Sequence, residues 1–487
     1  MDSEISARDE NELRETARKF DQEHIFRFWN ELDDAARARL SQQVGDIDFP
    51  FMHGLIERWV RNEPPPETFD AITPIPVIPP ADPARPDARA AFDAGEAALR
   101  AGRVGIVIVA GGQGTRLGFD GPKGAYPIGP VTRKTIFEYH AERIRAVNRR
   151  YACALPLYLM VSDTNEAATR AFFREHAWFG LNERDVLFFR QRMVPCVDTA
   201  GRFLLDAPDH VAANPNGHGG CIPALVDNGC TKDARARGVD TLYYFQVDNW
   251  AVNMADPYFI GYHVLGGGEM SSKVHRKEAL REGVGVHCIC DGEYRVIEYS
   301  ELDLYPQLLE TDDHGAIVHY AGNPAMHILD VGFVERIAGA YDRFPWHRAF
   351  KKIPFLDDAG DLSKPDAPNG YKFETFIFDA LRYITHAPIA LEIRRAGEYT
   401  PIKDFDGVNS VRRAWREQNA YWAGWIEAAG CPVPRDERGD VSIAVEISPL
   451  FALTRDEFIA KSDGRAWPTH QDLAIDPRGE VIAPRAP

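Results

Sequence analysis

The chain has 487 residues, enough for about three domains at roughly 150 residues each. Its 45% hydrophobic, 26% charged and 11% aromatic residues exclude the disordered, collagen-like and low-complexity classes. A net charge of −17 argues against general attraction to nucleic acid or an anionic membrane, and no apolar run approaches the roughly 18 residues of a membrane-spanning helix.

The first hundred residues predict a helical module followed by an extended connector. Apolar residues recur at helical spacing among charged neighbours from residue 8 to residue 61. Nine prolines between Pro64 and Pro86 exclude a helix or a central strand, so we expect an extended segment along the surface of the next domain. Helical periodicity resumes from Ala88 to Leu99. We place the first domain at residues 1–100.

Residues 101–405 predict a doubly wound α/β domain. Apolar, β-branched runs indicate strands, and amphipathic stretches between them indicate helices. The strands are expected at residues 105–110, 156–161, 185–189 and 241–247, and the helices at 135–147 and 165–175. Ligands of such sheets bind beyond the carboxyl ends of the strands, so we expect chemistry just after Ala110 and Val247. Residues 406–487, irregular and rich in tryptophan, predict a small C-terminal domain.

A glycine-rich loop follows the first predicted strand. It runs Gly111-Gly112-Gln113-Gly114-Thr115-Arg116, with Pro122-Lys123 shortly after. Glycines let backbone N–H groups approach a phosphate or a base closely, and Arg116 and Lys123 supply fixed positive charge. A P-loop needs Gly-Lys followed by Ser or Thr, and a dinucleotide-binding loop needs a different glycine spacing and a later acidic residue. The pattern therefore favours a nucleotidyltransferase loop, because a plain turn would leave both cations unexplained.

Residues 101–150 reverse the charge of the chain, with nine Lys or Arg against three Asp or Glu. This excess would attract an anionic substrate. Alternatively, Arg143, Arg145, Arg149 and Arg150 form the solvated face and last turn of a helix, which would account for nearly half of these cations.

Seven cysteines are scattered along the chain, which indicates reduced thiols in the cytoplasm. The N-terminal residues hold no secretory signal, in keeping with that location. Cys288 and Cys290 beside His287 are compatible with a metal clip, but the alternation over residues 286–290 favours a half-buried strand.

Further motifs occur in a fixed order. They are Gln191-Arg192-Met193-Val194-Pro195, Asn216-Gly217-His218-Gly219-Gly220, Val247-Asp248-Asn249, Lys273 through Gly285, Glu298-Tyr299-Ser300-Glu301, Gly322-Asn323, Lys351-Lys352-Ile353-Pro354, residues 368–379 and Pro401-Ile402-Lys403. With the glycine loop they resemble the UTP:sugar-1-phosphate uridylyltransferases, and among these the eukaryotic-type UDP-N-acetylglucosamine pyrophosphorylases. The resemblance spans about residues 20–415 and implies a Rossmann-like, GT-A-like nucleotidyltransferase core on a doubly wound mixed sheet.

The resemblance also implies the reaction. An oxygen of an N-acetylhexosamine 1-phosphate would attack the α-phosphate of UTP in line, giving pyrophosphate and a UDP-N-acetylhexosamine, which we expect to be UDP-N-acetylglucosamine. It assigns the leaving pyrophosphate to Arg116 and Lys123, the reacting phosphates to Lys403, and a single Mg²⁺ to Asp248. The oligomeric state is not predicted.

The remaining implied contacts bind the nucleotide and the sugar. The nucleotide would be held by Gly111, Gly112, Gly114, Thr115, Gln191, His218 and Gly219. The sugar would be held by Gly285, Glu298, Asn323, Lys372, Phe376 and Phe378.

Alternatives remain open at several residues. Asp248 also suits a helix N-cap, Glu298 a solvated strand position, and Phe376 and Phe378 an ordinary core.

The chain also departs from the family pattern at three positions. His218 replaces an Asn, Pro324 follows Asn323, and Trp250 stands where a smaller aliphatic residue is usual. These departures leave open a UDP-glucose or broad-specificity pyrophosphorylase and, more distantly, a non-catalytic UDP-sugar sensor.

Overall fold

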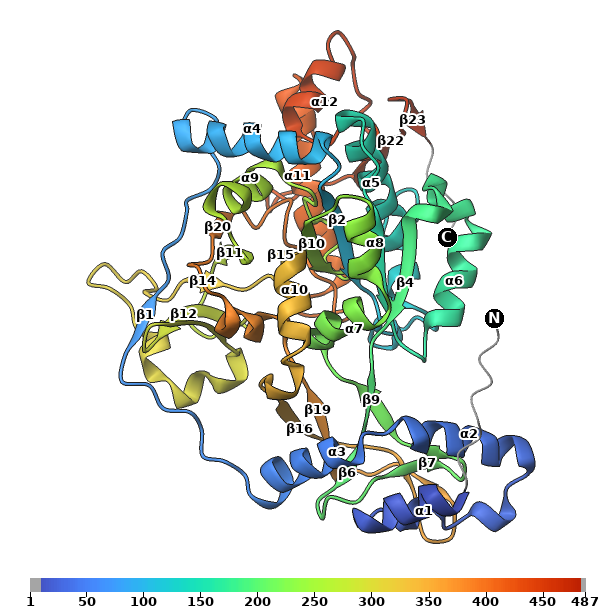
Figure 1. Cartoon of the computed structure of the whole chain (residues 1–487). Helices are drawn as coiled ribbons and strands as arrows, with labels where there is room; N and C mark the ends of the chain where they lie inside the picture. The colour runs from blue at the N-terminus through green and yellow to red at the C-terminus, as the bar shows by residue number, and fades with distance from the viewer. Residues whose placement is uncertain (1–9, 483–487) are drawn as a thin grey trace. The chain divides into compact units, whose positions relative to one another are not determined.

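The computed structural model describes residues 10–482, which divide into two compact units built from segments far apart in the sequence (Figure 1). Unit 1 comprises the chain up to Thr68 with Gln191–Cys221 and Gly339–Asp379, and unit 2 comprises Phe69–Arg190, Ile222–Ala338 and the chain from Ala380 onward. The division into domains at residues 100 and 405 stays a prediction. Among residues 10–482, no helix has the length and apolar character needed to cross a membrane.

Unit 2 is built on an eleven-stranded mixed sheet. Nine strands follow one path: β1 (Ile72–Pro74), β12 (Val286–Cys290), β14 (Ala321–Gly322), β11 (Met270–Arg276), β15 (His327–Asp330), β10 (Thr241–Gln246), β2 (Val104–Val109), β3 (Leu157–Val161) and β4 (Val186–Arg190). Off this path, β13 (Glu293–Ile297) pairs with β12, and β20 (Ala390–Ile393) pairs with β11. Neighbours from β10 to β4 are parallel, whereas β15 is antiparallel to both β10 and β11. The mixed sheet is confirmed.

The strands predicted from apolar runs correspond to β2, β3, β4 and β10. The run that forms β2 is buried on both faces, as expected for a central parallel strand. The helices of this unit are α4 (Pro86–Arg100), α5 (Ile136–Tyr151), α6 (Glu166–Glu175), α8 (Cys230–Ala236), α9 (Pro257–Gly266), α10 (Val331–Ala338), α11 (Val411–Ala428) and α12 (Arg455–Lys461). A further helix, α7 (Cys221–Asp227), begins at the last residue of a unit 1 segment. Part of the proline-rich connector becomes the edge strand β1, which pairs with β12.

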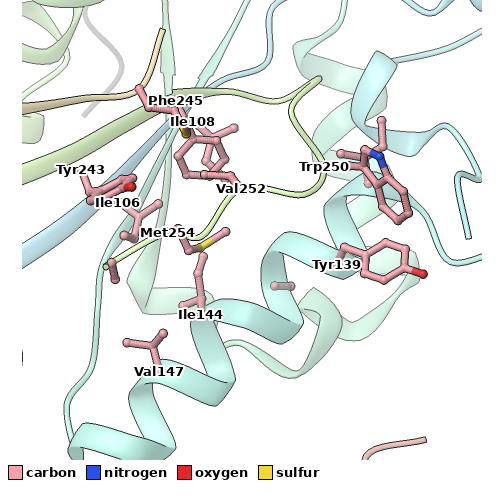
Figure 2. Packing of buried hydrophobic residues seen from close by; sticks show 14 of the residues in the cluster. Ile106, Ile108, Tyr139, Ile144, Val147, Tyr243, Phe245, Trp250, Val252 and Met254 are labelled. Atoms are coloured by element: carbon pink, nitrogen blue, oxygen red, sulfur yellow. The ribbon is translucent and has the colours of Figure 1, made fainter. Parts of the chain in front are cut away.

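Part of the core of unit 2 lies between the sheet and α5. Figure 2 shows Ile144 and Val147 of α5 in one cluster with Ile106 of β2 and Tyr243 of β10. Trp250 is fully buried in the same cluster, with its ring 5.1 Å from that of Tyr139. Trp250, one of the three departures from the family pattern, is therefore a core residue.

The four arginines of α5 differ in exposure: Arg149 and Arg150 in the last turn are exposed, as the helix alternative expects, whereas Arg143 and Arg145 contact other segments. Arg143 is buried and donates from Nη1 to the Trp250 carbonyl at 2.5 Å, and Arg145 donates to the Phe179 carbonyl at 3.1 Å. Burial lowers the pKa of Arg143 to about 10. The solvated-face alternative is wrong for Arg143, because helical position alone does not show that a neighbouring loop covers it.

The C-terminal residues share the core of unit 2. The tryptophans Trp422 and Trp425 of α11 pack into the cluster that contains β2 and β10. A three-stranded sheet follows, formed by β21 (Val445–Ile447), β22 (Leu473–Ile475) and β23 (Val481–Ile482). This region has secondary structure of its own but no separate hydrophobic core among the described residues.

Unit 1 joins the predicted N-terminal helices to two later segments. The helices are α1 (Glu10–Lys19), α2 (Asp34–Asp46) and α3 (Phe49–Ile56). The strands are β5 (Met193–Pro195), β6 (Val197–Asp198), β7 (Leu205–Ala207), β8 (His210–Val211), β9 (Ala213–Pro215), β16 (His347–Lys351), β17 (Phe355–Leu356), β18 (Leu362–Ser363) and β19 (Gly370–Glu374). Gln22 donates to the Gly201 carbonyl at 3.0 Å and accepts from the Phe203 N–H at 2.7 Å. The N-terminal region of unit 1 thus holds the 191–221 segment through the side-chain amide of Gln22.

Candidate functional site

Two parallel strands of unit 2 bring the predicted motifs to one edge of the sheet. In the ladder between β10 and β2, Gln246 lies opposite Val109, the last residue of β2. The glycine-rich loop and the Val247-Asp248-Asn249 segment therefore leave the sheet side by side. This is the expected position for a ligand site of a doubly wound sheet.

Two side chains after β3 hold the glycine-rich loop. Ser162 donates from Oγ to the Gly111 carbonyl at 2.8 Å, and Asn165 donates to the Ala110 carbonyl at 2.7 Å. The N–H groups of Gly111 and Gly112 donate to no acceptor within the described part of the chain. The loop thus keeps its carbonyls occupied and its donors available. Sequence reasoning missed Ser162 and Asn165, although the polar run directly after a predicted strand was a usable signal.

The glycines of the loop serve different purposes. A Cβ atom at Gly114 would lie 2.8 Å from the Phe119 ring, so that glycine is required by packing. A Cβ atom at Gly112, which is exposed, would find no atom within 4 Å. Folding therefore does not require glycine at position 112, and the space beside it is open to a ligand. Thr115 and Arg116 follow on an exposed short 3₁₀ helix, Thr115–Leu117.

A buried ion pair connects the loop to the end of β10. Lys123 Nζ lies 2.8 Å from Asp248 Oδ2. The Lys123 side chain is 12% exposed and the Asp248 side chain 11%. Burial raises the pKa of Asp248, but Lys123, Lys403 and Arg116 outweigh this effect and hold the pKa below its usual value. The structure thus brings the three predicted cations and the predicted metal ligand together. The N-cap alternative for Asp248 is wrong, since Asp256 caps the next helix, α9.

Asn249 fixes the segment that carries Lys403. Its Nδ2 donates to the Glu398 carbonyl at 2.8 Å, and its Oδ1 accepts from the Thr400 N–H at 3.0 Å. The Ile402 N–H donates to the Asp248 carbonyl at 3.1 Å. In the sequence, Asn249 stands out only as part of a motif, because its role as a positioning residue depends on contacts with residues about 150 positions away.

A buried lysine also holds the segment that precedes Lys403. Lys273, which is fully buried, places its ammonium 2.7 Å from Asp256 and 2.5 Å from Glu398. Burial opposes the charge, but the two carboxylates dominate and raise the pKa of Lys273. This charged group joins the N-terminus of α9 to the segment that precedes Lys403.

The predicted sugar residues of unit 2 also lie close together. The Asn323 N–H donates to the Gly285 carbonyl at 2.9 Å, and a Cβ atom at Gly285 would lie 3.0 Å from Glu298 Oε1. Glu298 is half-buried and directly precedes a short helix, Tyr299–Leu304, so the solvated-strand alternative is wrong. The side-chain oxygen of Asn323 accepts from the Ala325 N–H at 3.0 Å, which places Pro324 inside a tight turn.

Tyr399 is a buried aromatic residue of the segment that precedes Lys403, and sequence reasoning missed it. Its ring stacks on His275 with centroids 4.9 Å apart. Burial raises the pKa of Tyr399, and the charges of Asp248 and Glu298 both add to that effect. The aromatic ring thus lies within the electrostatic range of both carboxylates.

The remaining predicted residues lie in unit 1 and form their own cluster. The His218 ring stacks on Phe376 at 5.3 Å, Phe376 lies 5.1 Å from Phe378, and His347 stacks on Phe376 at 4.3 Å. The Ile377 N–H donates to His218 Nδ1 at 3.1 Å, so His218 supports the aromatic segment. The question of core or pocket is resolved in part: Phe378 is buried, whereas Phe376 is half-exposed. His347 was missed.

The other predicted residues of unit 1 are Gly219, Lys372 and Gln191. The Gly219 N–H donates to the Thr375 carbonyl at 2.9 Å, and a Cβ atom at Gly219 would lie 2.7 Å from Thr375 Oγ1. Lys372 lies in β19, opposite Ala349 of β16, and Gln191 is buried at the start of its segment. Gly219 is therefore required by packing, whatever else it contacts.

Comparison with known proteins identifies the family. A family model described as UTP–glucose-1-phosphate uridylyltransferase matches residues 85–412. The chain is 34% identical to the UDP-N-acetylhexosamine pyrophosphorylase-like protein 1 of Homo sapiens, over 96% of this chain and 99% of that protein. It is 35% identical to the UDP-N-acetylglucosamine pyrophosphorylase of Saccharomyces cerevisiae, over 69% of this chain and 72% of that protein.

Solved structures agree with this result. The uridine diphosphate N-acetylglucosamine pyrophosphorylase from Trypanosoma brucei, solved with an inhibitor, aligns with a TM-score of 0.77 at 25% identity. The alignment covers 96% of this chain and 98% of that chain, which confirms the predicted α/β fold. The chain belongs to the UTP–glucose-1-phosphate uridylyltransferase family.

Proposed function

We propose that this protein is a uridylyltransferase that forms UDP-N-acetylglucosamine and pyrophosphate from UTP and N-acetylglucosamine 1-phosphate. The observation that carries the proposal is the convergence of Arg116, Lys123 and Lys403 on Asp248 beyond β2 and β10. The names of the relatives from Homo sapiens and Saccharomyces cerevisiae support an N-acetylated sugar.

The chemistry requires charge neutralisation more than proton transfer. An oxygen of the sugar phosphate forms a bond to the α-phosphorus of UTP while the bond to the β-phosphate oxygen breaks and pyrophosphate leaves. The attacking oxygen is already ionised, so no general base is needed. Fixed cations that face the developing charge supply the electrostatic stabilisation.

Each cation of the cluster has a place in this reaction. Arg116, exposed on its short helix and 3.8 Å from Asp404, holds the leaving pyrophosphate together with Lys123. Lys403, fixed by the contacts of Asn249, holds the reacting phosphates. The donors of Gly111 and Gly112 bind the nucleotide, and the neighbouring Gly114 and Thr115 shape the loop.

Asp248 suits a magnesium ion that is shared with the substrate. No group of three or more His, Cys, Asp or Glu residues able to hold a metal occurs among residues 10–482. Mg²⁺ commonly binds one or two protein carboxylates and completes its shell with phosphates and water, so a single carboxylate fits. When bound, the ion neutralises phosphate charge.

The sugar is assigned to the two remaining clusters. Glu298 and Asn323, close together beside Gly285, offer hydrogen bonds to hydroxyl or amide groups. In unit 1, the half-exposed Phe376 beside Phe378 offers an apolar wall suited to an acetyl methyl group. As part of this proposal the protein works in the cytoplasm, which its seven free cysteines support.

A panel of sugar 1-phosphates tests the proposal. Pyrophosphate release from UTP should be measured with N-acetylglucosamine, N-acetylgalactosamine and glucose 1-phosphates, with and without Mg²⁺. We expect the highest kcat/KM with N-acetylglucosamine 1-phosphate and no turnover after removal of the metal. Preference for glucose 1-phosphate would overturn the sugar assignment, and tight UDP-sugar binding without pyrophosphate release would overturn the enzymatic activity.

A further inference from the structure

Unit 2 contains a strongly basic cavity that the proposed reaction does not use. It has a volume of about 430 Å³ and is lined by residues of α5, of α12 and of the turn from β22 to β23, elements that are labelled in the upper part of Figure 1. Its charged lining residues are Arg149, Arg150, Lys461, Arg465, Arg478 and Glu457. Five cations thus face one carboxylate in a chain whose net charge is −17.

Two of these cations are held without being neutralised. Arg149 donates from Nη2 to the Leu450 carbonyl, and Arg465 donates from Nη1 to the Gly479 carbonyl at 2.8 Å. A neutral carbonyl fixes a guanidinium group but leaves its full charge in place. The guanidinium groups are therefore preorganised, and their positive charge remains available to an anion.

The single acid of the cavity is shared. Glu457 lies 2.7 Å from Lys461 and 3.8 Å from Arg150. Lys461 also donates to the Phe451 carbonyl at 2.5 Å. Glu457 therefore offsets two cations. Arg478 is paired with Asp476 at 3.4 Å and with Glu480 at 3.0 Å, two acids outside the lining, so within residues 10–482 the charge left without an acidic partner is that of Arg149 and Arg465.

Helix dipoles explain only part of the cluster. Arg149 and Arg150 lie in the last turn of α5 and Lys461 ends α12, where cations are favourable. Arg465 lies in the loop after α12, and Arg478 lies in the turn between β22 and β23. Convergence of cations from three separate segments on one cavity is not explained by helix stabilisation.

The cavity is remote from the glycine-rich loop. α5 begins after that loop, beside the carboxyl edge of β2, and its 16 residues carry the chain about 24 Å toward the opposite edge. Arg149 and Arg150 stand at the far end of this helix. A phosphate bound there cannot belong to a nucleotide that occupies the loop.

We propose that this cavity is a second anion site, which binds a small phosphorylated ligand. Arginine guanidinium groups match phosphate oxygens with paired hydrogen bonds, and the volume falls within the roughly 300–1,000 Å³ of small-ligand sites. The ligand would bridge α5 and the C-terminal residues of unit 2.

Phosphate titration of the full chain tests the proposal. To separate the two sites, inorganic phosphate should be titrated into the variant Arg116→Gln/Lys403→Gln at constant ionic strength, with binding followed by calorimetry. We expect phosphate to bind this variant, and binding to weaken at least tenfold when Arg149→Gln and Arg465→Gln are added. A charge-matched control adds Arg281→Gln and Arg412→Gln, whose side chains are 63% and 72% exposed, and should leave binding unchanged.

A second pair of substitutions guards against misfolding. Arg150→Gln with Arg478→Gln changes side chains that are 38% and 76% exposed, so the fold should be retained while phosphate binding weakens. Absence of phosphate binding in the Arg116→Gln/Lys403→Gln variant would overturn the proposal. An equal loss in the charge-matched control would do so as well, because bulk charge would then account for binding.

Discussion

Asp248 and Lys123 are the pair of residues on which the proposed site depends. They are 125 positions apart in the sequence, yet their charged atoms lie 2.8 Å apart at the edge of the sheet. Lys123 neutralises a carboxylate that would otherwise be costly to bury. When a metal and a triphosphate bind, the same ammonium is positioned to contact phosphate oxygens.

The charge of Asp248 is the first target for mutation. We expect Asp248→Asn to lower kcat by about 100-fold or more, because the isosteric amide cannot offer the carboxylate to a metal. Steady-state assays of pyrophosphate release measure the effect, and circular dichroism checks the fold. The control Asp303→Asn removes an exposed carboxylate that pairs with Arg281, and it should leave kcat unchanged. Full activity of Asp248→Asn would refute the role of this aspartate.

A substitution at Gly112 distinguishes a loop that binds a ligand from a turn that only connects a strand to a helix. Because a Cβ atom there meets no protein atom within 4 Å, Gly112→Ala should leave the melting temperature unchanged. The methyl group would instead occupy space meant for the nucleotide, so we expect the KM for UTP to rise about tenfold, or about 1.4 kcal/mol. Gly424→Ala, at another open position in α11, is the matched control. An unchanged KM would show that no ligand approaches Gly112.

At the scale of elements, the sequence predicted the strands that carry the site. The run from Val104 to Val109 is apolar, β-branched and ended by glycines, so both its type and its end were recognisable. The strand order was not, because β15 enters between β10 and β11 from a distant part of the chain. Lys403 could be assigned only through the family resemblance, since its place depends on the contacts of Asn249 with a remote segment.

The segment that carries Lys403 offers a test of positioning. We expect Asn249→Ala to remove two buried hydrogen bonds and to cost about 1–3 kcal/mol of stability. Because Lys403 then loses its fixed position, kcat should fall more than the affinity for UTP changes. Thermal unfolding measures the loss of stability, and separate determination of kcat and of the KM for UTP measures the effect on turnover. A purely structural role would lower stability and leave kcat intact.

At the scale of the whole molecule, the chain builds unit 1 from three separate segments. Helical periodicity identified the N-terminal helices, but nothing in the local pattern shows that Gln22 and Gln43 pair with backbone groups of the 201–211 region. Such pairings require knowledge of the fold. The same limitation explains why Arg143 was compatible with a solvated face in the sequence although it is buried in the structure.

Three buried histidines make stability depend on pH. Burial lowers the pKa of His140 to about 3 and those of His263 and His287 to about 4. Between about pH 6.5 and pH 4 the unfolded chain therefore binds protons that the folded chain does not, and stability falls as the pH falls. The loss for each histidine reaches about 1.4 kcal/mol per pH unit.

Denaturant unfolding between pH 7 and pH 4.5 measures this dependence. His263 is the residue to replace, because it lies in the last turn of α9, a helix that carries none of the predicted site residues. We expect His263→Gln to reduce the slope of the free energy of unfolding against pH by the contribution of one histidine, which is about 1.4 kcal/mol per pH unit at most. An identical slope in the wild type and the variant would show that His263 is protonated equally in both states.

The most direct measurement of the central claim is a ³¹P NMR record of the reaction of UTP with N-acetylglucosamine 1-phosphate. We expect the diphosphate signals of a UDP-sugar and the signal of pyrophosphate to grow in equal amounts with the wild-type protein, and to stay absent with Asp248→Asn. Release of inorganic phosphate, or unchanged product formation by Asp248→Asn, would contradict it.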